Sequence, residues 1–181
     1  ASYQFTSRRV FDKLEALPQP TIAALNGYAL GGGFEIALCC DILICAKSAR
    51  LGLPEGLLGL LPGGGGTQRL TRAVGKYMAS DIMLAARRIT GERAYQLGLA
   101  AELVENDALA EAALARARAV LKLAPFATRE MKRLIRQGPD AALPTALAFE
   151  QEVLARLYAT DDAGEGIAAF LDKRDPKFKG A

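Results

Sequence analysis

Two glutamates are the first candidates for chemistry, because each is a lone charge in an apolar segment interrupted by glycine or proline. Glu35 lies in "GGGFEIALCC" and Glu55 in "LGLPEGLLG". A carboxyl group that loses hydration is protonated more readily, which suits proton transfer near neutral pH. Two such groups can hold one water and act as acid and base. Taken singly, each glutamate could instead be structural, for example as a complement to a helix dipole.

The three glycines before Glu35 allow two interpretations. Gly31–Gly33 could simply permit a sharp turn into a helix. Alternatively, they leave backbone N–H groups bare at the helix N-terminus, where these groups would stabilise a developing negative charge. Nucleotide-binding loops are not supported, since Ile36 occupies the last position of a G-x-G-x-x-G pattern and "PGGGGTQ" lacks Gly-Lys-Ser/Thr.

The bulk composition excludes several classes of protein. The 181 residues suffice for one sizeable domain, or for a core with an appended subdomain. Hydrophobic residues make up 51% and charged residues 24%, and the net charge of +3 is too small to indicate a nucleic-acid binder. We expect no membrane span and see no secretory leader. A cytoplasmic location is the default expectation, and an organellar one stays open.

Cysteine and histidine usage limits the chemistry further. Cys39, Cys40 and Cys45 lie close together in apolar surroundings, which favours buried free thiols over disulfides. There is no histidine, which excludes His-based triads and zinc sites of the usual kind within these residues. We therefore expect no metal site.

Short strands alternating with helices predict an α/β core over residues 1–105. A helix is expected over residues 2–17 and another from the triple glycine to about Cys40, with Thr90 capping a short one. Glu55 follows a proline and precedes a glycine, which places it in a turn. The remaining expected elements are strands over 21–25, 42–46, 49–53 and 99–104 and a long helix over 67–86.

After Asn106 the pattern becomes helical only. Asn106 or Asp107 is the expected cap of the first of these helices, and Pro144 falls in the first turn of a later one. Residues 106–181 are therefore predicted to form a C-terminal helical subdomain, an arrangement often used for subunit contacts.

The stretch "IAALNGYALGGGFEIALCCDILICAKSARLGLPEGLLGLLPGGGGTQRLTRAVGK" resembles the signature region of the crotonase superfamily, and of enoyl-CoA hydratases in particular. The resemblance continues through "ARRITGERAYQLGLAAELV" to "EGIAAFLDKRDPKFKG" and covers nearly the whole chain. It implies a crotonase-like (ClpP/crotonase) spiral of ββα units with a C-terminal helical trimerisation region. It also implies a homotrimer or a dimer of trimers.

The resemblance implies a reaction and site residues. Such enzymes bind acyl-CoA and stabilise a thioester enolate with two backbone N–H groups, and Gly32 would supply one of them. Glu35 would be the base that activates water and Glu55 the acid that protonates the α carbon, although two interacting carboxyls could share these roles. Water would thus add to a 2-enoyl-CoA to give a 3-hydroxyacyl-CoA, with acyl-CoA as substrate and no cofactor.

Three further positions match the family's motifs. Gly63 corresponds to the loop position whose backbone helps to hold the water. Lys173 corresponds to a lysine that contacts the CoA phosphates, often across a subunit boundary, and Phe170 packs nearby. The family's chain starts several tens of residues earlier, and we expect the second oxyanion donor and much of the CoA surface to come from that region.

Three other functions remain open on the sequence. A double-bond isomerase of the same fold typically uses one glutamate, so the presence of two favours hydration. A non-catalytic structural subunit is also open, although the two intact glutamates argue against it. An RNA-binding protein would use Arg129, Lys132, Arg133 and Arg136, which fall on one helical face. Such a charged face is usually only solvated, and no interleaved aromatic residues offer stacking platforms.

Overall fold

The computed structural model describes residues 2–181, with side chains from residue 9 onward, and divides the chain into two compact units. The first consists of the chain up to Leu17 and of Thr21–Ala115; the second consists of Pro18–Pro20 and Arg116–Ala181. The sequence placed the division after residue 105. The structure places it within α5 (Leu109–Val120), because Leu109 is buried against Ile44 and Ala46 of the first unit.

One sheet of the first unit is wholly parallel. Its strands are β1 (Ile22–Leu25), β3 (Ile42–Ala46) and β6 (Glu102–Val104), in the order β1-β3-β6. The central strand is the apolar run "ILICA", and its last three residues are fully buried. This is the composition expected of a strand paired on both sides and covered on both faces.

A second small sheet carries the site-forming turns. Its strands are β2 (Tyr28–Leu30), β4 (Arg50–Gly52) and β5 (Ile89–Thr90), in the order β2-β4-β5. The β2–β4 pair is parallel and the β4–β5 pair is antiparallel. The strands β2 and β5 are only three and two residues long, too short for a periodic pattern to predict them.

Helices of the first unit begin close to the predicted positions. They are α1 (Ser2–Glu15), α2 (Gly32–Leu38), η1 (Glu55–Leu58), α3 (Gly66–Leu84), α4 (Gly91–Gln96) and η2 (Asn106–Ala108). Thr90 caps α4 as predicted, accepting a hydrogen bond from Arg93 N–H at 3.0 Å. The predicted cap at Asn106 or Asp107 is wrong, because both residues lie in η2 and α5 begins only at Leu109. The side-chain oxygen of Asn106 instead accepts from Ser48 N–H.

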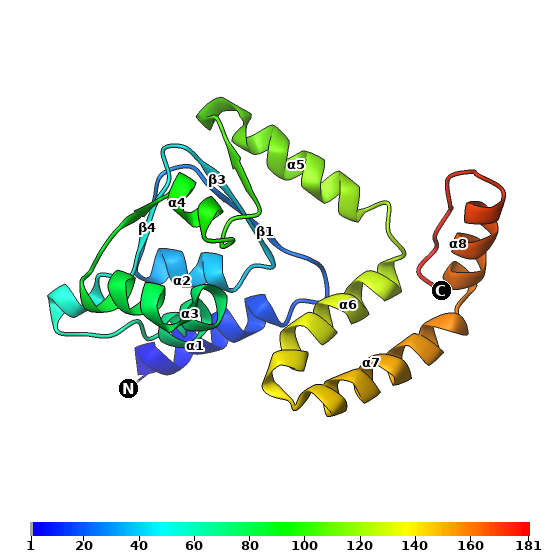
Figure 1. The fold of residues 1–181 in the computed structure, drawn as a ribbon, viewed down its shortest axis with the longest axis horizontal. Helices are drawn as coiled ribbons and strands as arrows, with labels where there is room; N and C mark the ends of the chain where they lie inside the picture. The colour runs from blue at the N-terminus through cyan, green and yellow to red at the C-terminus, as the bar shows by residue number, and fades with distance from the viewer. Residues whose placement is uncertain (1) are drawn as a thin grey trace. The chain divides into compact units, whose positions relative to one another are not determined.

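Helices α2 and α3 pack together beside the strands (Figure 1). Phe34 of α2 and Leu70 and Ile82 of α3 are fully buried in the same apolar cluster. The long helix predicted over 67–86 is interrupted, since Gly75 has a φ of 77° and a ψ of 164°. Only glycine adopts such a conformation readily, so the kink is located at this residue.

The cysteines are free thiols, as predicted. Cys39 and Cys45 are buried, and loss of hydration raises the pKa of each to about 11. Thiols with such values are poor nucleophiles.

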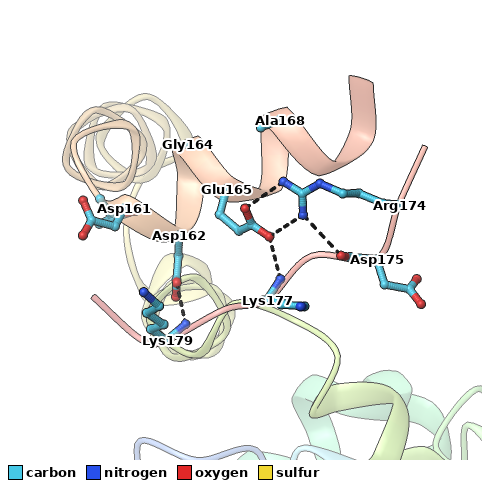
Figure 2. Close-up of a pocket in the computed structure, with 10 residues that line it drawn as sticks. Asp161, Asp162, Gly164, Glu165, Ala168, Arg174, Asp175, Lys177 and Lys179 are labelled. Carbon is cyan, nitrogen blue, oxygen red and sulfur yellow. Dashed lines mark hydrogen bonds and ion pairs between the residues drawn. The ribbon is translucent and has the colours of Figure 1, made fainter. Parts of the chain in front are cut away.

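The second unit is helical, as predicted. It contains α6 (Pro125–Gln137), η3 (Gly138–Asp140), α7 (Leu143–Tyr158) and α8 (Asp161–Leu171). Pro144 lies in the first turn of α7, and Thr160 caps α8 by accepting from Ala163 N–H at 3.2 Å. After α8 the chain folds back as a C-terminal strap, residues 174–181, beside that helix (Figure 2).

The basic face of α6 is not simply solvated. Lys132 is buried and its ammonium donates to the carbonyl of Gln19 at 2.9 Å. Arg133 pairs with Glu130 and lies 4.5 Å above the ring of Phe149. The expectation of a solvated face is therefore wrong for these two residues, which leaves fewer free charges for a nucleic acid.

None of the helices within residues 2–181 combines the length and apolar character needed to cross a membrane.

Candidate active site

The carboxylate of Glu35 is buried, and glycines in a neighbouring loop allow the backbone of that loop to approach it. It lies in the first turn of α2 and is only 4% exposed. Gly66 N–H donates to its Oε1 at 2.8 Å. A Cβ added at Gly66 would lie 3.0 Å from this oxygen, and one at Gly64 would lie 2.9 Å from Oε2. Both carboxylate oxygens therefore face a loop that can approach because it has no side chains.

Glu55 begins η1, just after β4 and the intervening proline. Its Oε2 is buried without a hydrogen-bond partner, and no other buried side-chain oxygen or nitrogen from residue 9 onward shares this condition. Loss of hydration raises the pKa of Glu55, and the negative charge of Glu35 raises it further, against the lowering effect of its own backbone N–H. Glu55 is thereby suited to carry a proton.

Gly31 brings the two carboxylates to one place. It precedes α2 with a φ of 55°, and its N–H donates to the carbonyl of Gly52 at 2.9 Å. A Cβ at this position would lie 3.1 Å from Glu55 Oε1. The glycine therefore allows the carboxylate of Glu55 to lie against the start of the helix that carries Glu35.

The start of α2 also presents bare backbone. The N–H groups of Phe34 and Glu35 both donate to the carbonyl of Gly31. Gly32 is exposed, and its N–H donates to no described acceptor, neither to the backbone of residues 2–181 nor to a side chain from residue 9 onward. This group is free to donate to a ligand, and its role as an oxyanion donor stays a prediction.

Gly63 opens the four-glycine run, and no carboxylate atom lies within 4 Å of a Cβ added at this position. It is exposed, and the nearest atom to an added Cβ is the carbonyl oxygen of Leu61 at 3.9 Å. The approaches to Glu35 come instead from Gly64 and Gly66. The water-positioning role of Gly63 stays a prediction.

Sequence reasoning missed the group that holds this loop. Arg69 of α3 donates from Nε and Nη2 to the two carboxylate oxygens of Glu15, at 3.0 and 2.7 Å. Its Nη1 donates to the carbonyl of Gly64 at 2.7 Å. The available signal was the spacing of Phe11 and Glu15, which puts an apolar and an acidic residue on one face of α1.

A comparison with known families decides the identity. The model of the enoyl-CoA hydratase/isomerase family matches residues 1–181. The chain belongs to this family. It is 44% identical over 180 residues to 2,3-dehydroadipyl-CoA hydratase of Escherichia coli. This match covers 99% of this chain and 71% of that protein. The chain is 45% identical over 177 residues to the mitochondrial methylglutaconyl-CoA hydratase of mouse, with 96% and 56% covered.

Solved structures agree with the sequence relatives. The enoyl-CoA hydratase from Bacillus anthracis superposes with a TM-score of 0.96 at 40% identity, covering 98% of this chain and 69% of that chain. The structure of DspI from Pseudomonas aeruginosa gives a TM-score of 0.95 at 39% identity, covering 98% of this chain and 68% of that chain. The predicted crotonase-type α/β fold is thus confirmed, and this chain spans from just over half to about seven tenths of the length of these relatives.

Within this enoyl-CoA hydratase/isomerase chain, the predicted CoA contacts lie in the second unit. Phe170 is 82% exposed in the last turn of α8. Lys173 follows with a φ of 54°, and its N–H donates to the carbonyl of Phe170 at 3.3 Å. The side chains of Arg174 and Glu165 then bind each other and close the reversal (Figure 2). The CoA role of Lys173 and Phe170 stays a prediction.

Proposed function

We propose that the protein is an enoyl-CoA hydratase that adds water across the double bond of 2-enoyl-CoA thioesters to give 3-hydroxyacyl-CoA. One observation carries the proposal: two carboxylates meet at the start of α2, and one of them has a buried oxygen without a partner. The family match and the hydratases among the relatives support the same reaction. Hydration needs an acid and a base on one water, which this pair supplies.

Glu35 acts as the base in this reaction. The N–H of Gly66 fixes its Oε1 and leaves Oε2 to accept a proton from water. The resulting hydroxide forms a bond to the β carbon of the enoyl group, and the π electrons move onto the thioester oxygen. Because Glu35 is buried, the proton transfer takes place away from bulk water.

Glu55 acts as the acid, and Gly32 as an oxyanion donor. The raised pKa of Glu55 keeps a proton on its carboxyl group to higher pH, and the enolate takes this proton at the α carbon. The Gly32 N–H donates to the thioester oxygen while that oxygen carries the negative charge. Loss of one such donor costs on the order of 10²–10³ in rate. Because the two carboxyls interact, a proton returns from Glu35 to Glu55 before the next turnover.

The second unit supports the finer proposals. Lys173 binds the CoA phosphates with Phe170 beside it, and the protein assembles as a homotrimer or a dimer of trimers in the cytoplasm. Exposed apolar side chains along α7 and α8 are of the kind that subunit contacts cover. They include Leu143, Leu147, Leu154, Ile167 and Leu171. Acyl-CoA is the substrate, and the proposed reaction needs no cofactor.

The experiment is the loss of conjugated-enoyl absorbance of crotonyl-CoA with the whole protein, beside Glu35→Gln and Glu55→Gln. We expect rapid loss with the wild type and a fall of at least about 10³-fold in both variants, which lack an ionisable group at one step. Glu92→Gln, an exposed glutamate on α4, is the matched control and should retain full activity. An inactive wild type, or two active glutamine variants, would overturn the proposal.

A further inference from the structure

We propose that Arg69, held by Glu15, is a positioning residue for catalysis. It sets the glycine loop, Pro62–Gly66, whose last N–H fixes the carboxylate of Glu35. The inference rests on the proposed function for its kinetic consequences, while its structural content is independent of the reaction.

The guanidinium of Arg69 is held as a two-sided clamp. One side forms a bidentate pair with Glu15, and the same edge lies 3.6 Å from Asp12 Oδ1. The other side donates from Nη1 to the carbonyl of Gly64 at 2.7 Å. The Arg69 side chain is only 17% exposed, and its hydrogen bonds to Glu15 raise its pKa. A charge-assisted fork of this geometry fixes a direction as well as a distance.

The loop wraps closely around that clamp. Gly65 has a φ of 104°, and a Cβ added there would lie 2.1 Å from Arg69 Nη1. Gly66 follows directly, and its N–H is the donor to Glu35. The Gly64 carbonyl and the Gly66 N–H belong to two consecutive peptide units that are joined at the Cα of Gly65, and peptide units are rigid planes. The position of Arg69 therefore determines where the donor to Glu35 points.

Helix α1 restrains the loop from a second side. A Cβ at Gly64 would lie 2.1 Å from a ring carbon of Phe11, so the backbone rests against this ring. Phe11 and Glu15 stand one helical turn apart on the same face of α1. One helix thus supplies both the apolar support of the loop and the anion that orients Arg69.

The kinetic test is Arg69→Met in the whole protein, with crotonyl-CoA as substrate. We expect kcat to fall about 10- to 100-fold while KM changes less than about 3-fold, because the variant displaces a catalytic group without touching the substrate. Arg72→Met is the matched control, since Arg72 is exposed on the same helix and hydrogen-bonds to Gln68. It should keep wild-type kcat. Equal losses in both variants, or a loss confined to KM, would overturn the inference.

A second readout separates positioning from general support of the fold. If Arg69 acts through Glu35, then adding Arg69→Met to Glu35→Gln should cost less than about 3-fold in the remaining rate. A loss as large as in the wild-type background would contradict the inference. Glu15→Gln keeps the shape of the clamp but removes its charge, and it should lower kcat in the same direction by a smaller factor. This variant serves if Arg69→Met does not fold.

Amide hydrogen exchange tests the structural content without any activity. Exchange in residues 63–66 should accelerate at least about 10-fold in Arg69→Met, because the loop loses its tether, and should stay unchanged in Arg72→Met. Unchanged exchange in the first variant would overturn the inference even in an active enzyme. If the wild type fails to hydrate crotonyl-CoA, the proposed function fails, and exchange still decides the role of Arg69 in holding the loop.

Discussion

The backbone N–H of Gly66 donates to Glu35 Oε1 at 2.8 Å, and this bond joins the first residue of α3 to the first turn of α2. Only proline at position 66 would remove this backbone donor, but other substitutions at Gly66 can move it. The bond therefore couples the packing of two helices to the orientation of a catalytic carboxylate, and the first prediction follows from this coupling.

Gly66→Ala should reduce both stability and activity. The added Cβ would lie 2.8 Å from Leu53 Cδ1 and 2.9 Å from Pro62 Cβ, so the start of α3 must shift. We expect a loss of about 1–3 kcal/mol in the free energy of unfolding, measured in urea, and a fall in hydration rate. Gly27→Ala is the control, because nothing lies within 4 Å of its added Cβ. Equal stability of the two variants would argue against a tightly packed junction.

The rate of hydration should fall as pH rises through the folded-state pKa of Glu55. Its protonated form is the acid, and burial and the charge of Glu35 place this pKa above the ordinary value of 4.5. The plot of kcat against pH should therefore have an alkaline limb that is set by the pair rather than by one group. A rate that stayed constant from about pH 5 to about pH 9 would contradict an acid role for Glu55.

The free energy of unfolding should also depend on the protonation of Glu55, and Glu55→Gln is the variant that tests this. A carboxyl group whose pKa is raised on folding contributes stability while it is protonated, and this contribution is lost as pH rises through the folded pKa. Glu55→Gln stays neutral at every pH. Its advantage over wild type in the free energy of unfolding should therefore be larger at about pH 8 than at about pH 4. A difference independent of pH would contradict the assignment.

Asp162 should be essential to the C-terminal strap. It is 4% exposed and accepts from Lys179 N–H at 2.7 Å and Gly180 N–H at 2.8 Å, one bond to each oxygen. Asp162→Asn puts an N–H₂ group against one of these donors, with a cost of about 1–3 kcal/mol. We expect limited proteolysis to cleave residues 174–181 much faster in this variant. Asp161→Asn, which changes the exposed neighbour, is the control.

Acid should break the pair of Glu165 and Arg174 and so loosen the C-terminal strap. Hydrogen bonds from Arg174 and from Lys177 N–H lower the pKa of Glu165 to about 2, from an ordinary value of 4.5. A lowered pKa gives stability that is complete above the unfolded value and is lost as pH falls toward the folded one. The rate of amide exchange in residues 174–180, corrected for intrinsic rates, should rise as the pH falls from about 4.5 to about 2. Arg174→Met should remove most of that pH dependence.

Local patterns predicted much of the fold because their signals are short-range. The run "ILICA" is β3 to the residue, and Thr90 and Pro144 stand at their expected helix starts. The errors arise where a distant partner decides. Asn106 binds Ser48 instead of capping a helix, and Lys132 is buried because Gln19 offers a carbonyl. Neither partner is visible in the local sequence.

The candidate site likewise contains residues that the sequence identified and residues that it did not. Glu35 and Glu55 were identifiable because each is the lone charge of its segment, and the structure places their charges close enough to interact. The pair of Glu15 and Arg69 was missed because charged residues are common on helices and nothing local marks these two as partners. Gly66 donates to Glu35 and a Cβ added at Gly64 would approach its other oxygen, while a Cβ added at Gly63 would meet neither carboxylate. The path of a loop through four glycines has no side-chain pattern that could reveal this difference.

Burial of Cys39 has a consequence for an enzyme that handles thioesters. This cysteine directly follows α2, the helix that carries Glu35 and begins at the proposed oxyanion donor. A thiolate near an acyl-CoA would attack the thioester carbonyl, take over the acyl group and leave the enzyme acylated. With a pKa of about 11, only about one such thiol in ten thousand is ionised at pH 7. The apolar packing around Cys39 therefore keeps this thiol un-ionised and unreactive toward thioesters.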